Sequence, residues 1–141
     1  MTEVEMERIL ATWIGRLRLR DWDIKINYVL RPGEKPDGTG IDTDNDAEIR
    51  VHDYHEQATI RLDATWGEWD SDKANRVIVH ELLHVYERET WRPVDQAQNA
   101  MSKPAFEMLW GWYVAGRERW IEKLANAIVD MTENPNTQPK G

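Results

Sequence analysis

The sequence has no cysteine, and this absence excludes one class of fold and one class of metal site. A small secreted fold stapled by disulfides needs cysteine pairs, and a thiolate zinc site needs cysteine ligands. Any metal ion that the chain binds must therefore be held by histidine nitrogens and carboxylate oxygens. Histidine is also scarce, with four among 141 residues, so the candidate nitrogen ligands are few.

Long hydrophobic runs are missing as well. No apolar stretch approaches the roughly 20 residues that a membrane span needs. The first seven residues, MTEVEME, are acidic and lack the apolar centre of a signal peptide. We therefore expect a soluble, cytoplasmic protein with no membrane partner.

Positive charge is in deficit, because 18 Lys and Arg stand against 26 Asp and Glu and the formal net charge is -8. An acidic surface repels a phosphate backbone, so we expect no nucleic-acid partner. Among the aromatic residues, one Phe contrasts with eight Trp, and we expect most of these Trp side chains in the core or at interfaces.

Hydrophobic periodicity predicts an α+β fold. Apolar residues recur at helical spacing in three segments and alternate with polar residues in three others. We expect helices over residues 4–19, 71–88 and 105–131, and strands over residues 21–30, 47–52 and 58–63.

Proline, glycine and polar residues predict where these elements are interrupted. Residues 31–46 are expected to form an exposed loop, and residues 90–103 a connection with a short helix over 95–101. One domain is expected for a chain of this length, over residues 1–131, followed by a disordered tail over 132–141.

The strongest chemical signal is the run His80-Glu81-Leu82-Leu83-His84, which has the His-Glu-x-x-His pattern of zinc hydrolases. Residues four apart on a helix lie about 40° apart on one face and one turn apart along the axis. His80 and His84 could therefore bind the same metal ion. The alternative is an amphipathic helix that carries two surface histidines.

Glu81 lies to the side of the two histidines in this arrangement. From there its carboxylate could take a proton from a water molecule that the metal activates. We therefore expect Glu81 to be the catalytic general base.

A catalytic zinc site needs a third protein ligand and leaves a fourth position for water. No histidine follows His84, and the positions at which a metzincin has Gly and His hold Glu87 and Thr90. The metzincin class is therefore excluded. We expect the third ligand to be a carboxylate on the C-terminal helix.

Three glutamates share one face of that helix: Glu107, Glu118 and Glu122. Glu107 and Glu118 would be about 16 Å apart along the axis, so they cannot both bind one ion. We favour Glu118, because Glu122 one turn later could accept a hydrogen bond from a ligand imidazole. Glu107 has Gly111 at that place and remains the alternative, and any of the three could be an ordinary solvated charge.

The His-Glu-x-x-His run and the later segment Glu118-Arg119-Trp120-Ile121-Glu122 together resemble the gluzincin metallopeptidases. The similarity is greatest to minimal single-domain members from phages and prokaryotes, the minigluzincins. The segment from Leu19 to Ile24 also looks like phage-encoded members, which would place the protein in the host cytoplasm. In thermolysin-like gluzincins the third ligand is a glutamate on a later helix with an acid four residues on, which Glu118 and Glu122 match.

The resemblance implies a zincin-like fold and a reaction. The fold would be a short, mostly antiparallel sheet packed on an N-terminal helix, an active-site helix and a long C-terminal helix that carries the glutamate. The cofactor would be Zn2+ held by His80, His84 and Glu118, and the reaction would be hydrolysis of a peptide or protein substrate with Glu81 as base.

The resemblance also implies that substrate pairs with an edge strand, for which residues 58–62 are the candidate. The chain departs from thermolysin because it has no separate C-terminal domain. It also has no clear Tyr or His to stabilise the oxyanion, and Tyr86 and Tyr113 are the candidates for that role.

Two other functions fit the same residues. A zinc-stabilised binding or inhibitor protein of phage origin would need His80, His84 and Glu118 for folding but would not need Glu81. A latent peptidase would keep its own cleft occupied, with residues 132–141 as the candidate segment. Two histidines and one carboxylate could also bind iron, nickel or cobalt in place of zinc.

Overall fold

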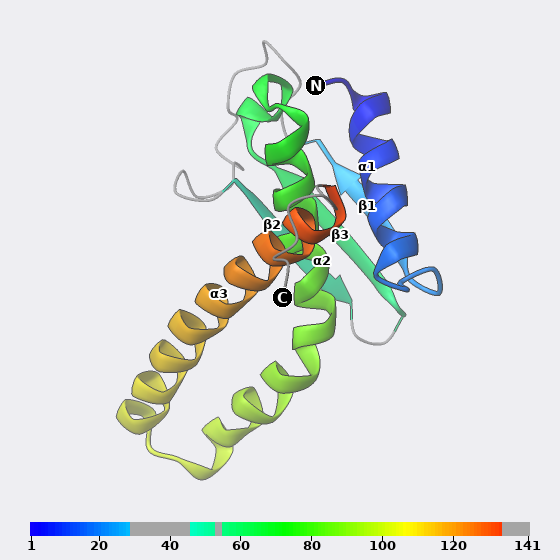
Figure 1. The fold of residues 1–141 in the computed structure, drawn as a ribbon. Coiled ribbons are helices and arrows are strands. Elements are labelled where there is room, and N and C mark those ends of the chain that lie inside the picture. The colour runs from blue at the N-terminus through cyan, green and yellow to red at the C-terminus, as the bar shows by residue number, and fades with distance from the viewer. Residues whose placement is uncertain (29–45, 53–54, 134–141) are drawn as a thin grey trace. The chain divides into compact units, whose positions relative to one another are not determined.

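The structure is a computed structural model that describes residues 1–28, 46–52 and 55–133. These residues form an α+β fold (Figure 1). The elements are α1 (Glu3–Arg16), β1 (Asp23–Asn27), β2 (Ala47–His52), β3 (Gln57–Leu62), the 3-10 helix η1 (Ala64–Glu68), α2 (Ser71–Gln96), the 3-10 helix η2 (Ala97–Ala100) and α3 (Lys103–Glu133). The predicted loop and tail lie almost entirely outside the described residues.

The chain groups into two compact units, Met1–Leu82 and Leu83–Gly141, and the boundary between them falls inside α2. The first unit contains α1, the three strands and the first part of α2. The second unit contains the rest of α2 and α3. The predicted single domain stays a prediction.

Helix α1 begins at a complete capping box and ends three residues before the predicted position. The Thr2 hydroxyl accepts a hydrogen bond from the backbone N–H of Glu5, and the Glu5 carboxylate accepts one from the N–H of Thr2. At the other end Arg18 has a φ of 59°, and the N–H of Leu19 donates to the carbonyl of Ile14 at 2.9 Å. This is a Schellman motif, which stops the helix before the predicted end at residue 19.

The sheet is mixed, with strand order β1-β3-β2. β2 pairs antiparallel with β3 as a hairpin, whereas β1 pairs parallel with β3. The prediction of a mostly antiparallel sheet therefore holds for β2 and β3 and is wrong for β1 and β3. The edge-strand prediction was wrong, because residues 58–62 belong to β3, whose two sides are both paired.

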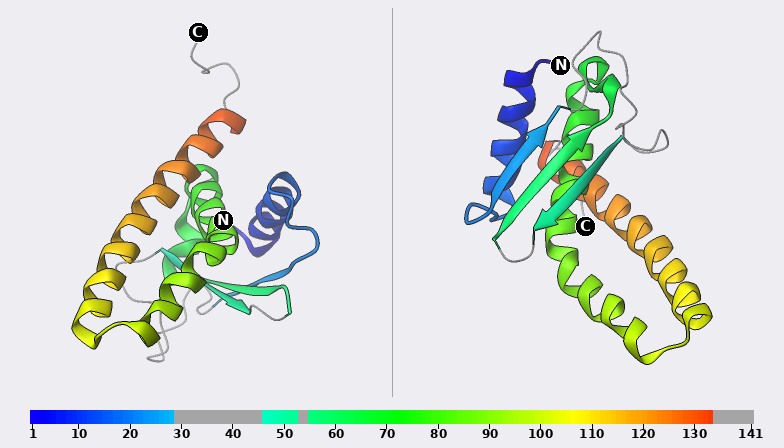
Figure 2. Two further views of the ribbon diagram at one scale, coloured as in Figure 1. Left: turned by 90° about the horizontal axis from the view of Figure 1, so that it is seen from below. Right: turned by 180° about the vertical axis from the view of Figure 1, so that it is seen from behind.

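The first unit has two layers. Helix α1 and the part of α2 before Leu83 cover the same face of the sheet (Figure 2). The side chains of β3 that are buried are Ala58, Ile60 and Leu62, every second residue of the strand. From α1, Met6, Leu10 and Trp13 are buried at helical spacing. The core of this unit therefore lies between one face of the sheet and the two helices.

Helix α2 starts as predicted but continues beyond its predicted end. The Asp70 carboxylate accepts a hydrogen bond from the N–H of Lys73 at 2.8 Å, which caps the first turn. The helix then continues through Pro93 to Gln96, so residues 90–96 are helical and the predicted connection is shorter. Proline removes one helical hydrogen bond, which destabilises the helix. Trp91 packs edge-on against Trp110 of α3 with ring centroids 6.2 Å apart, and this contact stabilises the additional turns. The short helix predicted over 95–101 is η2.

Helix α3 spans the predicted range with about two residues more at each end. No helix in the described part of the chain is both long and apolar enough to cross a membrane.

A buried hydrogen bond joins α1 to α2 inside the first unit. The indole N–H of Trp13 donates to Asn75 Oδ1 at 2.6 Å, and the Asn75 amide donates to the carbonyl of Ser71 at 2.7 Å. Trp13 is 1% exposed and Asn75 is 7% exposed. Without its acceptor, the indole N–H would be buried and unsatisfied.

We therefore expect Asn75→Ala to lower the free energy of unfolding by about 1–3 kcal/mol, the usual cost of an unsatisfied buried donor. Chemical denaturation followed by circular dichroism measures the change. The matched control is Asn99→Ala, at an exposed asparagine of η2, which should change stability by less than about 0.5 kcal/mol. Equal stability of the two variants would show that the bond contributes nothing.

Candidate metal centre

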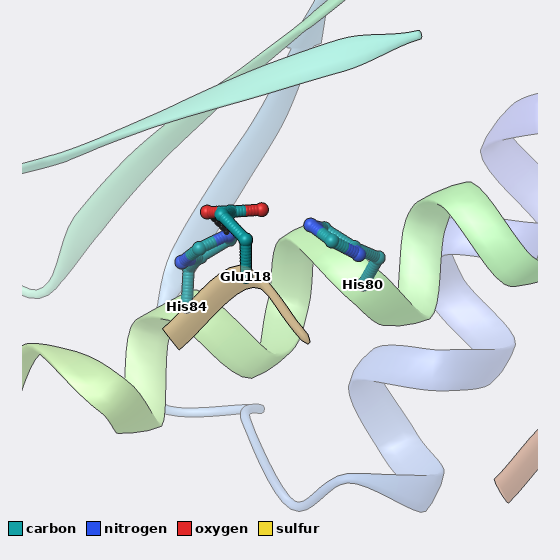
Figure 3. Close-up of side chains that lie close together, drawn as sticks. All are labelled: His80, His84 and Glu118. Carbon is teal, nitrogen blue, oxygen red and sulfur yellow. Dashed lines mark ion pairs between the residues drawn. The ribbon is translucent and has the colours of Figure 1, made fainter. Parts of the chain in front are cut away.

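Helix α2 places the two histidines. His80 and His84 are one turn apart on the uninterrupted helix, about 6 Å along its axis. Both side chains project from the same side of the helix (Figure 3), and both residues are partly buried. The boundary between the units falls between them, but the helix is continuous there, so helical geometry alone determines their spacing.

Helix α3 brings Glu118 to His84. The Glu118 Oε1 atom lies 3.3 Å from His84 Nε2, and both residues belong to the second unit. The His84 side chain is 13% exposed, whereas the Glu118 side chain is 46% exposed. The imidazole is therefore largely shielded from solvent, whereas the carboxylate is partly in contact with it.

The structure brings the three predicted ligands together. One ligand atom from each of His80, His84 and Glu118 lies within 4.8 Å of the other two. Two donors on one tetrahedral zinc, each at about 2.1 Å, are about 3.4 Å apart, close to the separation of His84 and Glu118. Nitrogen and carboxylate donors are also types that zinc accepts. The residues therefore fit the ion, although an ion pair would give the same His84–Glu118 distance, and metal binding stays a prediction.

The other two glutamates of the predicted face lie elsewhere. Glu107 is exposed and precedes Glu118 by about three turns of α3, so it is not part of the three-residue group. Glu122 is exposed one turn beyond Glu118. Its role as the hydrogen-bond partner of an imidazole stays a prediction.

Glu81, the predicted general base, follows His80 directly on α2 and is 5% exposed. A carboxylate is seldom so deeply buried on a soluble protein unless it has a partner or a function. Its burial therefore distinguishes Glu81 from exposed glutamates such as Glu107 and Glu122.

A second buried carboxylate, Glu87, had no predicted role. Its side chain is 4% exposed, and its Oε2 lies 3.6 Å from Nδ1 of His84. Its Oε1 accepts a hydrogen bond from the Tyr113 hydroxyl, and its Oε2 lies 3.9 Å from the Arg117 guanidinium. Glu87 follows His84 by three residues and so shares its helix face, which was the only signal for it in the sequence.

Tyr113, a candidate for oxyanion stabilisation, donates its hydroxyl proton to Glu87. Burial raises the pKa of the Tyr113 phenol above its ordinary value, and the hydrogen bond to Glu87 and the charge of that carboxylate raise it further. The nearby Arg117 acts in the opposite direction. The phenol therefore stays protonated and remains a donor at neutral pH. Tyr86, the other candidate, is 50% exposed.

We expect Glu118→Ala to abolish stoichiometric metal binding, because it removes one of three ligands. The loss of affinity should exceed the roughly 10–100-fold that removal of a supporting residue costs. Elemental analysis and zinc titration measure it. Glu107→Ala, which removes an exposed glutamate from the same helix, is the control and should bind like the wild type. If Glu107→Ala lost the metal and Glu118→Ala kept it, the assignment of the third ligand would be wrong.

Comparison with known proteins gives no relative for this chain. No protein-family model, no curated protein and no solved structure matches it. The function is therefore inferred from the residues and distances of the site.

Proposed function

We propose that the protein is a zinc-dependent metallopeptidase of the gluzincin type, with His80, His84 and Glu118 as the metal ligands. The observation that carries the proposal is the approach of Glu118 to Nε2 of His84 at 3.3 Å. The motif at residues 80–84 lies on one helix, whereas this contact joins His84 to a residue of another helix, 34 positions later in the sequence. A third ligand from a later helix is what distinguishes a gluzincin site from two histidines on a surface helix.

The donor set indicates the chemistry. Two imidazoles and one carboxylate suit zinc, and a site with three protein ligands leaves room for water or substrate. When bound, zinc polarises a carbonyl and lowers the pKa of a coordinated water molecule.

Glu81 would move the proton in this reaction. Its carboxylate accepts a proton from the attacking water as the water oxygen bonds to the peptide carbonyl carbon. It then gives that proton to the departing amine as the C–N bond breaks, so that the carboxylate is regenerated. The burial of Glu81 supports this role, because a buried carboxylate next to a ligand is shielded from competing bulk water.

A competing proposal is a zinc-stabilised binding protein, and one observation favours it. Glu118, Glu87 and Tyr113 all join α2 to α3 inside the second unit, so a metal could serve only to hold the two helices together. Such a protein would lose its fold when the metal is removed, yet it would have no use for a proton acceptor at residue 81.

Glu81→Gln separates the two functions. We expect this variant to keep one zinc per chain and to lose at least about 100-fold in hydrolysis rate, because general-base catalysis typically contributes 10²–10⁴-fold. Elemental analysis gives the metal content, and a library of fluorogenic peptides gives the rate. Glu107→Gln is the matched control for the loss of one carboxylate and should retain both properties.

Wild-type turnover by Glu81→Gln would contradict the mechanism. A wild-type protein that binds zinc, unfolds when zinc is chelated and cleaves no peptide of the library would support the binding protein.

A further inference from the structure

We propose that Glu87 is a positioning residue that fixes the ring orientation and tautomer of His84, and that Tyr113 and Arg117 hold Glu87 in place. The inference rests on the proposed function, because it assigns Nε2 of His84 to the metal and Nδ1 to Glu87. All four residues lie in the second unit of the chain.

The two ring nitrogens of His84 face two different carboxylates. Nδ1 lies 3.6 Å from Glu87 Oε2, and Nε2 lies 3.3 Å from Glu118 Oε1. Metal-binding histidines usually donate the N–H of the other ring nitrogen to a carboxylate, a carbonyl or water, which makes the imidazole a better ligand. Glu87 occupies that position. At 3.6 Å the two atoms are slightly beyond hydrogen-bond distance, and the proposal is that this contact becomes a hydrogen bond.

Burial makes Glu87 suited to this task. Its side chain is 4% exposed, so water competes little for its oxygens, whereas Glu118 on the other side of the ring is 46% exposed. An anion this deeply buried is costly unless it has partners. The charge of Glu87 therefore needs compensation from neighbouring side chains.

Two side chains of α3 provide that compensation. The Tyr113 hydroxyl donates to Glu87 Oε1, which leaves Oε2 facing the imidazole. The Arg117 guanidinium lies 3.9 Å from Glu87 Oε2 and 3.7 Å from Glu118 Oε1, and it packs over the Tyr113 ring with 5.6 Å to the centroid. One cation thus lies beside both carboxylates that face His84, and the phenol prevents Glu87 from turning away.

A purely structural role for Glu87 would join α2 to α3 without acting on the imidazole. That role changes the stability of the protein, and it can also change the metal affinity, because the proposed ligands lie on both helices. It does not set the tautomer of His84. The tautomer therefore decides between the roles, and the metal affinity shows what the contact contributes to binding.

The first measurement is the His84 tautomer, recorded by long-range ¹H–¹⁵N NMR on metal-free protein at a pH where the imidazoles are neutral. It is made in a Glu118→Ala background, which removes the competing carboxylate at Nε2. In water, neutral histidine favours the Nε2–H tautomer. Because Glu87 would accept a hydrogen bond from Nδ1, we expect His84 to show the Nδ1–H tautomer instead. Adding Glu87→Met, which has no acceptor, should return His84 to Nε2–H, and Glu87→Gln should give a smaller shift.

The second measurement is zinc affinity with Glu118 intact. We expect Glu87→Met to weaken binding by about 10–100-fold, as loss of a supporting carboxylate usually does, and Glu87→Gln to weaken it less. Glu107→Gln removes an exposed carboxylate of α3 that lies outside the three-residue group, so it is the control and should bind zinc like the wild type. Circular dichroism verifies that each variant is folded.

An unchanged tautomer in the Glu87 variants would overturn the inference, whatever their zinc affinity. If Glu87→Met does not fold, Glu87→Gln decides alone by the same tautomer measurement. A wild type that binds no zinc, combined with the expected tautomer change, would reject the proposed function and leave the Glu87–His84 interaction standing.

Discussion

The candidate centre depends on the approach of Glu118 to His84. Without it, α2 would carry two histidines one turn apart and nothing else that distinguishes a metal site from an ordinary helix surface. With it, two imidazoles and a carboxylate lie within 4.8 Å of one another. If Nε2 of His84 binds a metal, the other ring nitrogen, Nδ1, needs a partner, since metal-binding histidines usually donate that N–H to a carboxylate, a carbonyl or water.

The need for a partner at Nδ1 accounts for the polar groups around His84. Glu87 faces the second nitrogen of His84, and its buried charge requires the Tyr113 hydroxyl and the Arg117 guanidinium. Each partner comes from α3, the helix that also carries Glu118. The proposed ligands His84 and Glu118 and the groups proposed to orient His84 therefore lie on one helix pair, so a change in the packing of α2 against α3 would disturb both together.

The second half of α2 shows how tertiary contacts can override local sequence signals. Pro93 and the polar residues after position 90 predict the end of a helix, yet α2 continues to Gln96. The extra turns carry Trp91 to the ring of Trp110, and Trp110 in turn lies 5.8 Å from the ring of Tyr113. Tyr113 also donates the hydrogen bond to Glu87, so this group of aromatic rings is continuous with the polar contacts of the candidate site.

The sequence by itself predicted the helices and strands and the three candidate ligands, His80, His84 and Glu118. Periodicity located three helices and three strands, because burial of one face repeats every 3.6 or every two residues. The His80–His84 pair needed only helical spacing, and Glu118 was favoured over Glu107 by its neighbour four residues on. Tertiary structure alone decided that β3 is the central strand and that Glu87, Tyr113 and Arg117 meet at His84. The reason is physical: strand order and buried charge networks depend on contacts between distant segments, and local periodicity carries no information about which segments meet.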